Sequence, residues 1–395
     1  MRNSMNHIVL FQFGLLSFSC VEPYEYLSTS YDELIVIEGL LTDENKNHEI
    51  KISYTYPVDF SSSFVEIDNA EVFIEEKERS IYHFHYTDSG KYVSDNSFQG
   101  LYGKEYRLVV NTEDGQRYQS TYELLVPSPP IDSIYDFYAE LPNSETDEIE
   151  PGIQFFISTN DQSGIAKYFR YELQETYKIV VPYPSYFEVQ DGSVVRRIDQ
   201  VGSCYKSVKP SNLIIGTSSS NSENRLEEFP LNFIFQSSQK IRTRYSVLVK
   251  QYAISETAYH YYRRLKENNE STGSLSDKQT GTIVGNISST QGANEPVLGY
   301  FEVSGTSEKR EFFSFSDFDP RFEPASFQAL CDYRRARRFS FQEGIEFIQS
   351  NQGYQIHTIE YASGPGTSDA LIILTKSCTS CAEYADTTPP NYWIP

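Results

Sequence analysis

The sequence is short of basic residues, of histidine and of tryptophan, and its longest apolar stretch is too short to cross a bilayer as a helix. Its 33 Lys and Arg residues are outnumbered by 55 Asp and Glu residues, which gives a formal net charge of −22 at pH 7. Nucleic acid phosphates repel so acidic a chain, so we expect no nucleic acid partner. The 31 Tyr and 26 Phe residues favour a β-rich exported protein, because aromatic side chains fit pleated surfaces.

Catalytic and nucleotide-binding signatures are also missing from the sequence. It has no G-x-S-x-G elbow, no H-E-x-x-H motif, no Walker A loop and no dinucleotide fingerprint. Of the six histidines only His83 and His85 are close together, on one face of a predicted strand, where they could supply two metal ligands. No third ligand is identifiable, so we predict no metal site, no cofactor and no catalytic residue.

The N-terminal segment indicates export. Residues 8–18 form an apolar run of the length typical of a secretory signal, whereas a membrane-spanning helix needs about 20 apolar residues. Cys20 follows, at the position where a bacterial lipoprotein carries its acyl chains, although Ser17 stands where an aliphatic residue is usual. We predict a signal peptide at residues 1–19 and lipid attachment at Cys20. A soluble secreted protein with a spare cysteine is the alternative.

Four cysteines follow Cys20 in the chain: Cys204, Cys331, Cys378 and Cys381. An even number in an exported protein favours disulfides, and three pairings are open. The last two are spaced C-x-x-C, as in half a zinc site or a redox motif. A zinc site would usually show a second close pair, and a redox motif would precede a helix, whereas this one leads into a Pro-rich tail. We therefore expect structural disulfides.

Alternating apolar residues predict a β-sandwich in the first part of the chain. Strand patterns occur at 34–41, 49–56, 70–74, 106–110 and 117–126. This spacing is typical of a sandwich of immunoglobulin or transthyretin-like size. We place the sandwich at residues 34–127, behind an acidic tether at 20–33.

A second, larger β-rich domain is predicted at residues 128–395. Strand patterns recur there, for example at 244–252, and the acidic stretch 140–152 is predicted to be a solvated loop. One segment near 255–270 is helical, because Ser255 can cap it and its apolar residues recur at helical spacing. The predicted fold class is therefore mainly β, with inserted loops and one clear helix.

Several motifs, taken together, resemble a known family. They are LIVIEGLLTDE (34–44), GLYGKEYRLVV (100–110), PPIDSIY (129–135), VLGYFEVSGTSEKREFF (297–313) and CTSCAEYADTTPPNYW (378–393). In these the chain is similar to the Bacteroidota outer-membrane lipoproteins described as domain of unknown function 4249. The most specific motifs are Val-Leu-Gly-Tyr-Phe at 297–301 and the C-x-x-C followed by Pro-Asn-Tyr-Trp at 390–393, where family members usually show Asp-Phe-Trp.

The resemblance implies an outer-membrane lipoprotein, often encoded beside a TonB-dependent receptor, with no established activity. We therefore expect a non-enzymatic accessory protein, anchored through Cys20 and exposed either to the periplasm or at the cell surface, that docks on or binds cargo for a TonB-dependent transporter. A surface hydrolase acting on glycans or peptides is the alternative, which two facing carboxylates in a cleft would favour. A broad aromatic patch without such a pair would favour docking. An adhesin or structural surface protein is a third interpretation.

Overall fold

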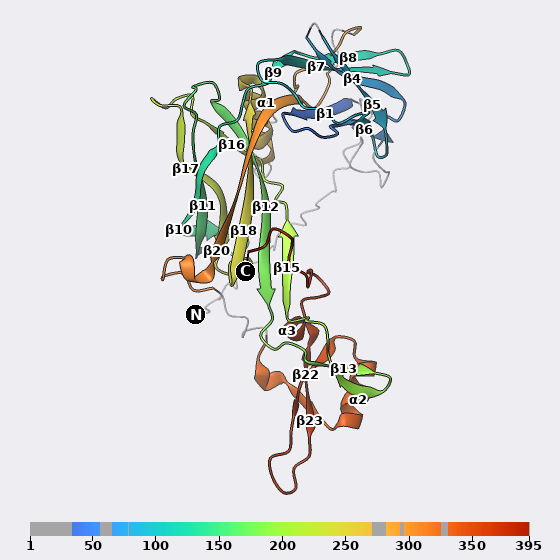
Figure 1. Ribbon diagram of the computed structural model, residues 1–395, viewed down its shortest axis with the longest axis vertical. Coiled ribbons are helices and arrows are strands. Elements are labelled where there is room, and N and C mark those ends of the chain that lie inside the picture. Colours follow the sequence, from blue (N-terminus) through green and yellow to red (C-terminus); the bar gives the residue numbers. More distant parts are fainter. Residues whose placement is uncertain are drawn as a thin grey trace, which may run out of the picture.

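The structure is a computed structural model that describes residues 34–55, 65–77, 79–270, 282–292, 296–324 and 331–394. The molecule is elongated, with an N-terminal β unit at one end, long strands in the middle and a small module at the other end (Figure 1). Strands dominate, which confirms the mainly β fold class. None of the helices in these ranges is long and apolar enough to cross a membrane.

The N-terminal unit folds an antiparallel sheet around an apolar core. Side chains from alternate positions of its strands meet in this core, and Ile37, Ile50 and Val72 are almost wholly buried. Its strands are β1 (Ile35–Thr42), β2 (Glu49–Tyr54), β3 (Val65–Glu66), β4 (Ala70–Glu76), β5 (Ile81–Tyr86), β6 (Lys91–Ser94), β7 (Glu105–Thr112), β8 (Arg117–Ser120) and β9 (Glu123–Leu124). Strands β1, β2, β4, β7 and β8 lie where alternation predicts them.

Residues from much later in the chain complete this unit. Strand β19 (Ile287–Ser289) pairs with β8, and the start of β20 (Phe301–Ser314) pairs with β1 in parallel. Ile287, Val297 and Phe301 are buried in the N-terminal core. The core therefore combines residues on both sides of the division that the sequence suggests at 127/128.

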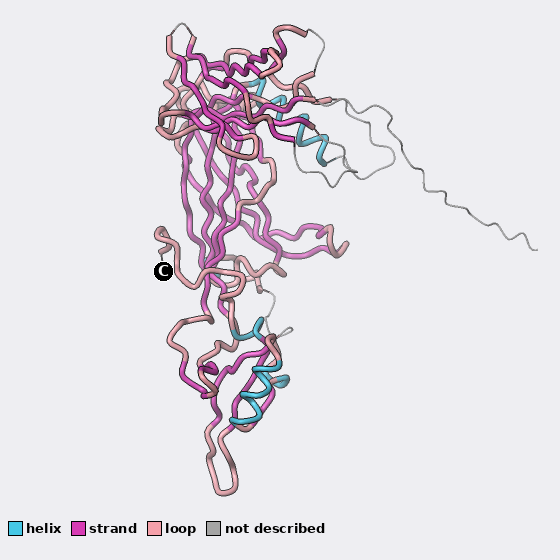
Figure 2. Tube along the Cα trace, turned by 90° about the vertical axis from the view of Figure 1, so that its right-hand side faces the viewer, coloured by secondary structure: helices cyan, strands magenta, loops and turns pink. Residues whose placement is uncertain are grey.

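Two packed sheets form the middle of the molecule (Figures 1 and 2). In the first, β20 pairs with β18, β18 with β12, and β12 with β15 and β16; the second has the order β10–β11–β17. Phe155, Tyr245 and Phe313 lie in the core between them. Besides β20, the strands of these two sheets are β10 (Ile131–Asn143), β11 (Glu148–Asn160), β12 (Tyr168–Val180), β15 (Ser203–Val208), β16 (Ile214–Thr217), β17 (Arg225–Phe235) and β18 (Arg244–Ile254).

The predicted helix is present as α1 (Glu256–Glu270). The Ser255 Oγ accepts a hydrogen bond from the backbone N–H of Ala258 (3.1 Å), so Ser255 caps the helix as predicted. Ala258 and Tyr261 are buried in a small cluster with Tyr300, whose ring centroid lies 4.9 Å from that of Tyr261. The tyrosine stripe of this helix therefore serves its attachment to the sheet.

The prediction of a solvated loop at 140–152 is wrong. Strands β10 and β11 continue through this stretch, with Leu141 opposite Glu150 and Asn143 opposite Glu148. Only residues 144–147 form a turn. Acidic residues are compatible with strands here because they lie at the exposed end of a hairpin, where no core contact is required.

A small module at the far end, which we call the distal module, consists of residues 181–202 and 331–379. Its core includes Ile356, Leu371 and Ile373. Ser340 begins its longer helix with a capping box to Glu343. Its elements are β13 (Phe187–Gln190), β14 (Ser193–Arg196), η3 (Tyr333–Arg335), β21 (Arg337–Phe339), α2 (Phe341–Ser350), β22 (Tyr354–Glu360), β23 (Ala370–Thr375) and α3 (Lys376–Thr379).

Two disulfides lie where the distal module meets the long sheet. Cys204 at the start of β15 bonds Cys381, and Cys331 bonds Cys378. The expectation of structural disulfides is confirmed, and one of the three open pairings is selected. The two cysteines of the C-x-x-C motif therefore belong to different bridges.

Candidate functional site

The predicted lipid attachment residue, Cys20, and the tether at 20–33 lie outside the described residues. The two neighbouring histidines lie on β5 as expected, but each has its own partner. The Nδ1 of His85 is 2.8 Å from Oδ1 of Asp95, and the ring of His83 contacts that of Phe73 at 5.8 Å. Within the described ranges no group of three His, Cys, Asp or Glu residues is placed to hold a metal ion.

A fully buried carboxylate, that of Glu175, lies in the core between the two sheets. Its Oε1 accepts hydrogen bonds from the Tyr245 hydroxyl (2.8 Å) and the Asn232 amide (2.8 Å), and its Oε2 accepts one from the Lys240 ammonium. The charge is thus balanced and its oxygens are occupied. Glu175 therefore connects β12 to β17 and β18 in the interior of the middle region.

Asp136 and Asp317 are close enough for the charge of one carboxyl group to act on the other. Asp136 lies on the inner face of β10, opposite Phe155, and Asp317 lies in η1 (Phe315–Asp317). Burial, together with the nearby charge of Asp317, raises the pKa of Asp136 to about 6. The Oδ2 of Asp317 accepts a hydrogen bond from the Ser314 N–H at 2.7 Å. This pair is the feature that a hydrolase hypothesis would have to use.

An exposed aromatic surface covers the outer side of the β10–β11–β17 sheet. We call it the aromatic face; it comprises Tyr135, Phe137, Phe156, Phe233 and Phe235. The rings of the first three contact one another, with centroid distances of 5.7 to 5.9 Å. The rings of Phe233 and Phe235 contact each other at 4.8 Å.

The strand register explains why these rings share one side. Phe137 lies opposite Gln154, and Gln154 lies opposite Phe233, so the three side chains form one row across the sheet. The neighbouring position on β11, Phe155, points into the core instead. A glycine at position 152 leaves room for the ring of Phe233, since a Cβ there would lie 2.5 Å from a ring atom.

The aromatic face is partly open to solvent. Phe137 is 53% exposed and Leu141, on the same side of β10, is 38% exposed, whereas the other four rings of the face are half-buried. Acidic residues surround the hairpin tip, so the apolar surface has a polar rim. Exposed apolar patches with polar rims are typical of interaction sites. Aromatic residues occur on both sides of β10 and β11, so the sequence alone does not reveal which side is outward.

The Val-Leu-Gly-Tyr-Phe motif at 297–301 joins the N-terminal unit to the middle region. The N–H of Ile37 donates to the carbonyl oxygen of Leu298 at 2.9 Å. Gly299 has a φ of +92°, and a Cβ there would lie 2.0 Å from the Ile37 carbonyl oxygen, so only glycine fits. The Tyr300 hydroxyl donates to Glu123, and Phe301 is fully buried. The motif is explained by structure, with no ligand required.

Fold and surface together define a β-rich, disulfide-bonded protein with an exposed aromatic sheet face. The sequence model of the family described as Domain of unknown function (DUF4249) matches residues 21–310, and the chain belongs to this family. The matched region includes the N-terminal unit, the aromatic face and the glycine motif, and it ends before the second segment of the distal module. No curated protein matches the chain.

Proposed function

We propose that this protein is a lipid-anchored accessory protein of the outer membrane that docks on a TonB-dependent transporter through the aromatic face. The observation that carries the proposal is the group of aromatic side chains on the outer side of the β10–β11–β17 sheet, of which Phe137 is more than half exposed. Family membership and the two disulfides, which require an oxidising compartment, support an exported accessory role.

The chemistry of the aromatic face suits a protein partner. Aromatic residues are enriched in the buried centres of protein interfaces, where they contribute much of the binding free energy. Burying one large apolar side chain contributes about 1.5 to 3 kcal/mol. Phe137 is 53% exposed in the isolated chain, so a partner can gain about half of that contribution at this position.

A surface hydrolase is the second candidate, and the pair formed by Asp136 and Asp317 is the observation that favours it. A carboxyl with a pKa of about 6 beside a second carboxyl group is the arrangement that glycoside hydrolysis uses. Asp136, however, lies on the inner side of the sheet, opposite a buried phenylalanine. We therefore place docking first.

The test is a crosslinked pull-down of the tagged protein from native outer membranes, with partners identified by mass spectrometry. Phe137→Asp should abolish recovery of a TonB-dependent receptor, because it puts a charge at the most exposed ring of the aromatic face. The matched control is Ile81→Asp, since Ile81 is also 53% exposed but lies on β5. Cys20→Ala should reduce recovery by releasing the protein from the membrane.

Two outcomes would overturn the proposal. One is full recovery of the receptor with Phe137→Asp, and the other is the absence of any receptor from the wild-type sample. Glycan or peptide cleavage that disappears in Asp136→Asn but persists in Phe137→Asp would establish the hydrolase in its place.

A further inference from the structure

The distal module has a second concentration of exposed aromatic residues, unrelated to the aromatic face. Four rings from three chain segments contact one another, and we call them the distal aromatic cluster: Tyr183, Tyr186, Tyr333 and His357. Their centroid distances run from 5.2 to 6.1 Å. Tyr186 is 49% exposed and Tyr333 is 44% exposed. The Nδ1 of His357 lies 2.7 Å from a backbone carbonyl oxygen, which orients its ring.

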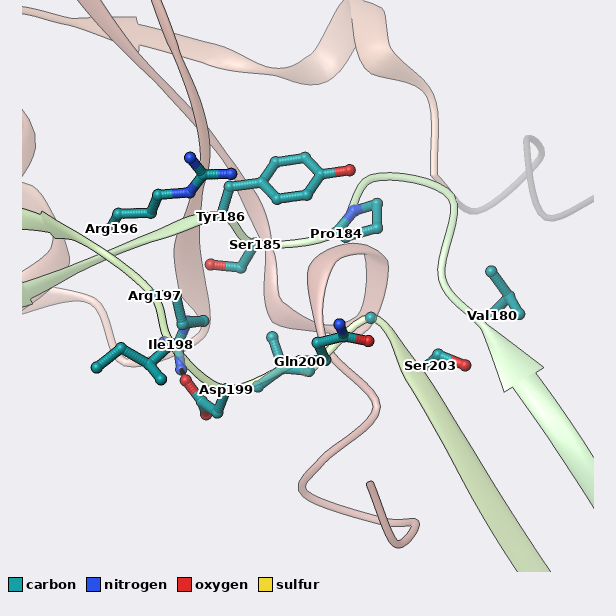
Figure 3. A pocket seen from close by; sticks show the side chains of 12 residues that line it. Val180, Pro184, Ser185, Tyr186, Arg196, Arg197, Ile198, Asp199, Gln200 and Ser203 are labelled. Atoms are coloured by element: carbon teal, nitrogen blue, oxygen red, sulfur yellow. Dashed lines mark hydrogen bonds and ion pairs between the residues drawn. The ribbon is translucent and has the colours of Figure 1, made fainter. Parts of the chain in front are cut away.

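A pocket of about 480 Å³ opens beside this cluster, on the joint between β12, β14 and β15. This volume is within the range of small-molecule sites, about 300 to 1,000 Å³. Figure 3 shows Tyr186 and Arg196 together on one side of the pocket and Gln200 and Ser203 on another. The lining thus combines an aromatic ring, a cation, an amide and a hydroxyl.

The cations near the pocket differ in whether their charge is already balanced. Arg197 pairs with Asp199, which lines the pocket, and with Glu188, both at 3.2 Å, so its own charge is balanced. The exposed side chains of Arg196 and Arg335 have no ion-pair or hydrogen-bond partner in the part of the chain that the structure describes. Arg196 therefore brings an unpaired guanidinium to the pocket, whereas the charge of Arg335 acts on the carboxylate of Asp332.

Arginines are concentrated in the segment that supplies Tyr333. Besides Arg335, it contains Arg334, Arg337 and Arg338. Arg334 pairs with Asp332, and Arg338 pairs with Glu360. The guanidinium of Arg337 lies over the rings of Phe347 and Tyr354. The distal module is therefore nearly neutral, with arginines and aromatic rings close together, on an otherwise acidic protein.

We propose that this pocket and the distal aromatic cluster bind a sugar residue that carries an acidic group, as part of a glycan. The apolar face of a sugar ring stacks on an exposed tyrosine, such as Tyr186. A carboxylate or phosphate on the ring pairs with Arg196, and hydroxyl groups bond Gln200 and Ser203. Arginine suits this role because its planar group binds oxyanions through two parallel hydrogen bonds. The proposal is independent of docking through the aromatic face, which lies on another sheet.

The experiment titrates the purified full-length protein with a uronic acid oligosaccharide, oligogalacturonate, by isothermal calorimetry. Its methyl ester, which keeps the ring and loses the charge, is the ligand control, and a sugar phosphate tests the other source of acidic charge. Arg196→Gln should weaken binding of the charged ligand by about tenfold or more, the effect of one lost charge-assisted hydrogen bond. Tyr186→Ala should weaken binding of both the charged ligand and its ester.

The matched protein control is Tyr361→Ala, which removes another exposed tyrosine of the same module, 68% exposed at the end of β22. Preference for the sugar phosphate over the uronate would assign the acidic group as phosphate. The proposal is overturned if neither acidic ligand binds, if the ester binds as tightly as the acid, or if Arg196→Gln and Tyr186→Ala bind like Tyr361→Ala. None of these results depends on a receptor, so the docking proposal is tested separately.

Discussion

Replacing Glu302 by glutamine is expected to destabilise the protein by about 3 kcal/mol, because it leaves a buried arginine without its charge partner. Glu302 is 2% exposed at the start of β20 and accepts hydrogen bonds from Nε of Arg170 (2.9 Å) and Nη2 (3.1 Å). The hydroxyl groups of Tyr262 and Ser304 donate to the same carboxylate, each at 2.6 Å. The cluster thereby connects β12, β20 and α1.

The magnitude follows from what remains after the substitution. Breaking a buried ion pair from one side costs about 3 to 5 kcal/mol. Arg170 would keep its contact with the Tyr252 ring, 4.1 Å from the guanidinium, and its hydrogen bond to Glu172. Because the side chain of Glu172 is 53% exposed, water screens that second pair, and we expect the lower end of the range.

The assay is urea unfolding of both variants, followed by circular dichroism and tyrosine fluorescence. The matched control is Glu49→Gln, which breaks the exposed pair between Glu49 and Lys91 (3.8 Å) and should cost less than about 1 kcal/mol. If Glu302→Gln and Glu49→Gln unfold at the same urea concentration, the reasoning about the buried pair is refuted.

Three further predictions concern pH, cross-linking and backbone space. Since burial and Asp317 raise the pKa of Asp136 to about 6, the folded state binds this proton more tightly than the unfolded state, whose pKa is about 4. The stability that this group contributes is present below about pH 4 and is lost as the pH rises through 6. In thermal melts, Asp136→Asn should therefore be as stable as wild type at pH 4. At pH 7.5 it should be more stable than wild type by about 1 kcal/mol, a value that allows for solvent screening. Replacing both Cys204 and Cys381 by serine should cost about 2 to 5 kcal/mol in urea unfolding, and unchanged stability would show that the bridge contributes nothing. Gly299→Ala should cost about 2 kcal/mol or more, because the added Cβ meets a facing carbonyl oxygen; a wild-type melting temperature would contradict this.

Local patterns predicted local structure well. The period-2 strands of the N-terminal unit and the helix capped by Ser255 depend on neighbouring residues, and the structure confirms them. The prediction for the acidic stretch 140–152 was wrong because charged residues indicate only that a segment is exposed to solvent. The end of a β-hairpin can be exposed while its two strands remain hydrogen-bonded to each other. Net charge and loop composition do not report hydrogen bonding between strands.

Contacts between distant segments could not be predicted from the sequence. The pairing of Cys204 with Cys381 joins residues separated by 177 positions, and spacing alone leaves three connectivities open. The distal module has the same difficulty, since its core combines β13 and β14 with strands beyond residue 331. The aromatic face became recognisable only when the register placed Phe137 and Phe233 in one row.

Docking through the aromatic face is tested most directly by photo-crosslinking in native membranes. A benzophenone amino acid replaces Phe137 in one variant and Ile81 in the other, since both side chains are 53% exposed. The account predicts a crosslinked adduct with a TonB-dependent receptor from position 137 and none from position 81. No adduct from position 137, or equal adducts from the two positions, would contradict it.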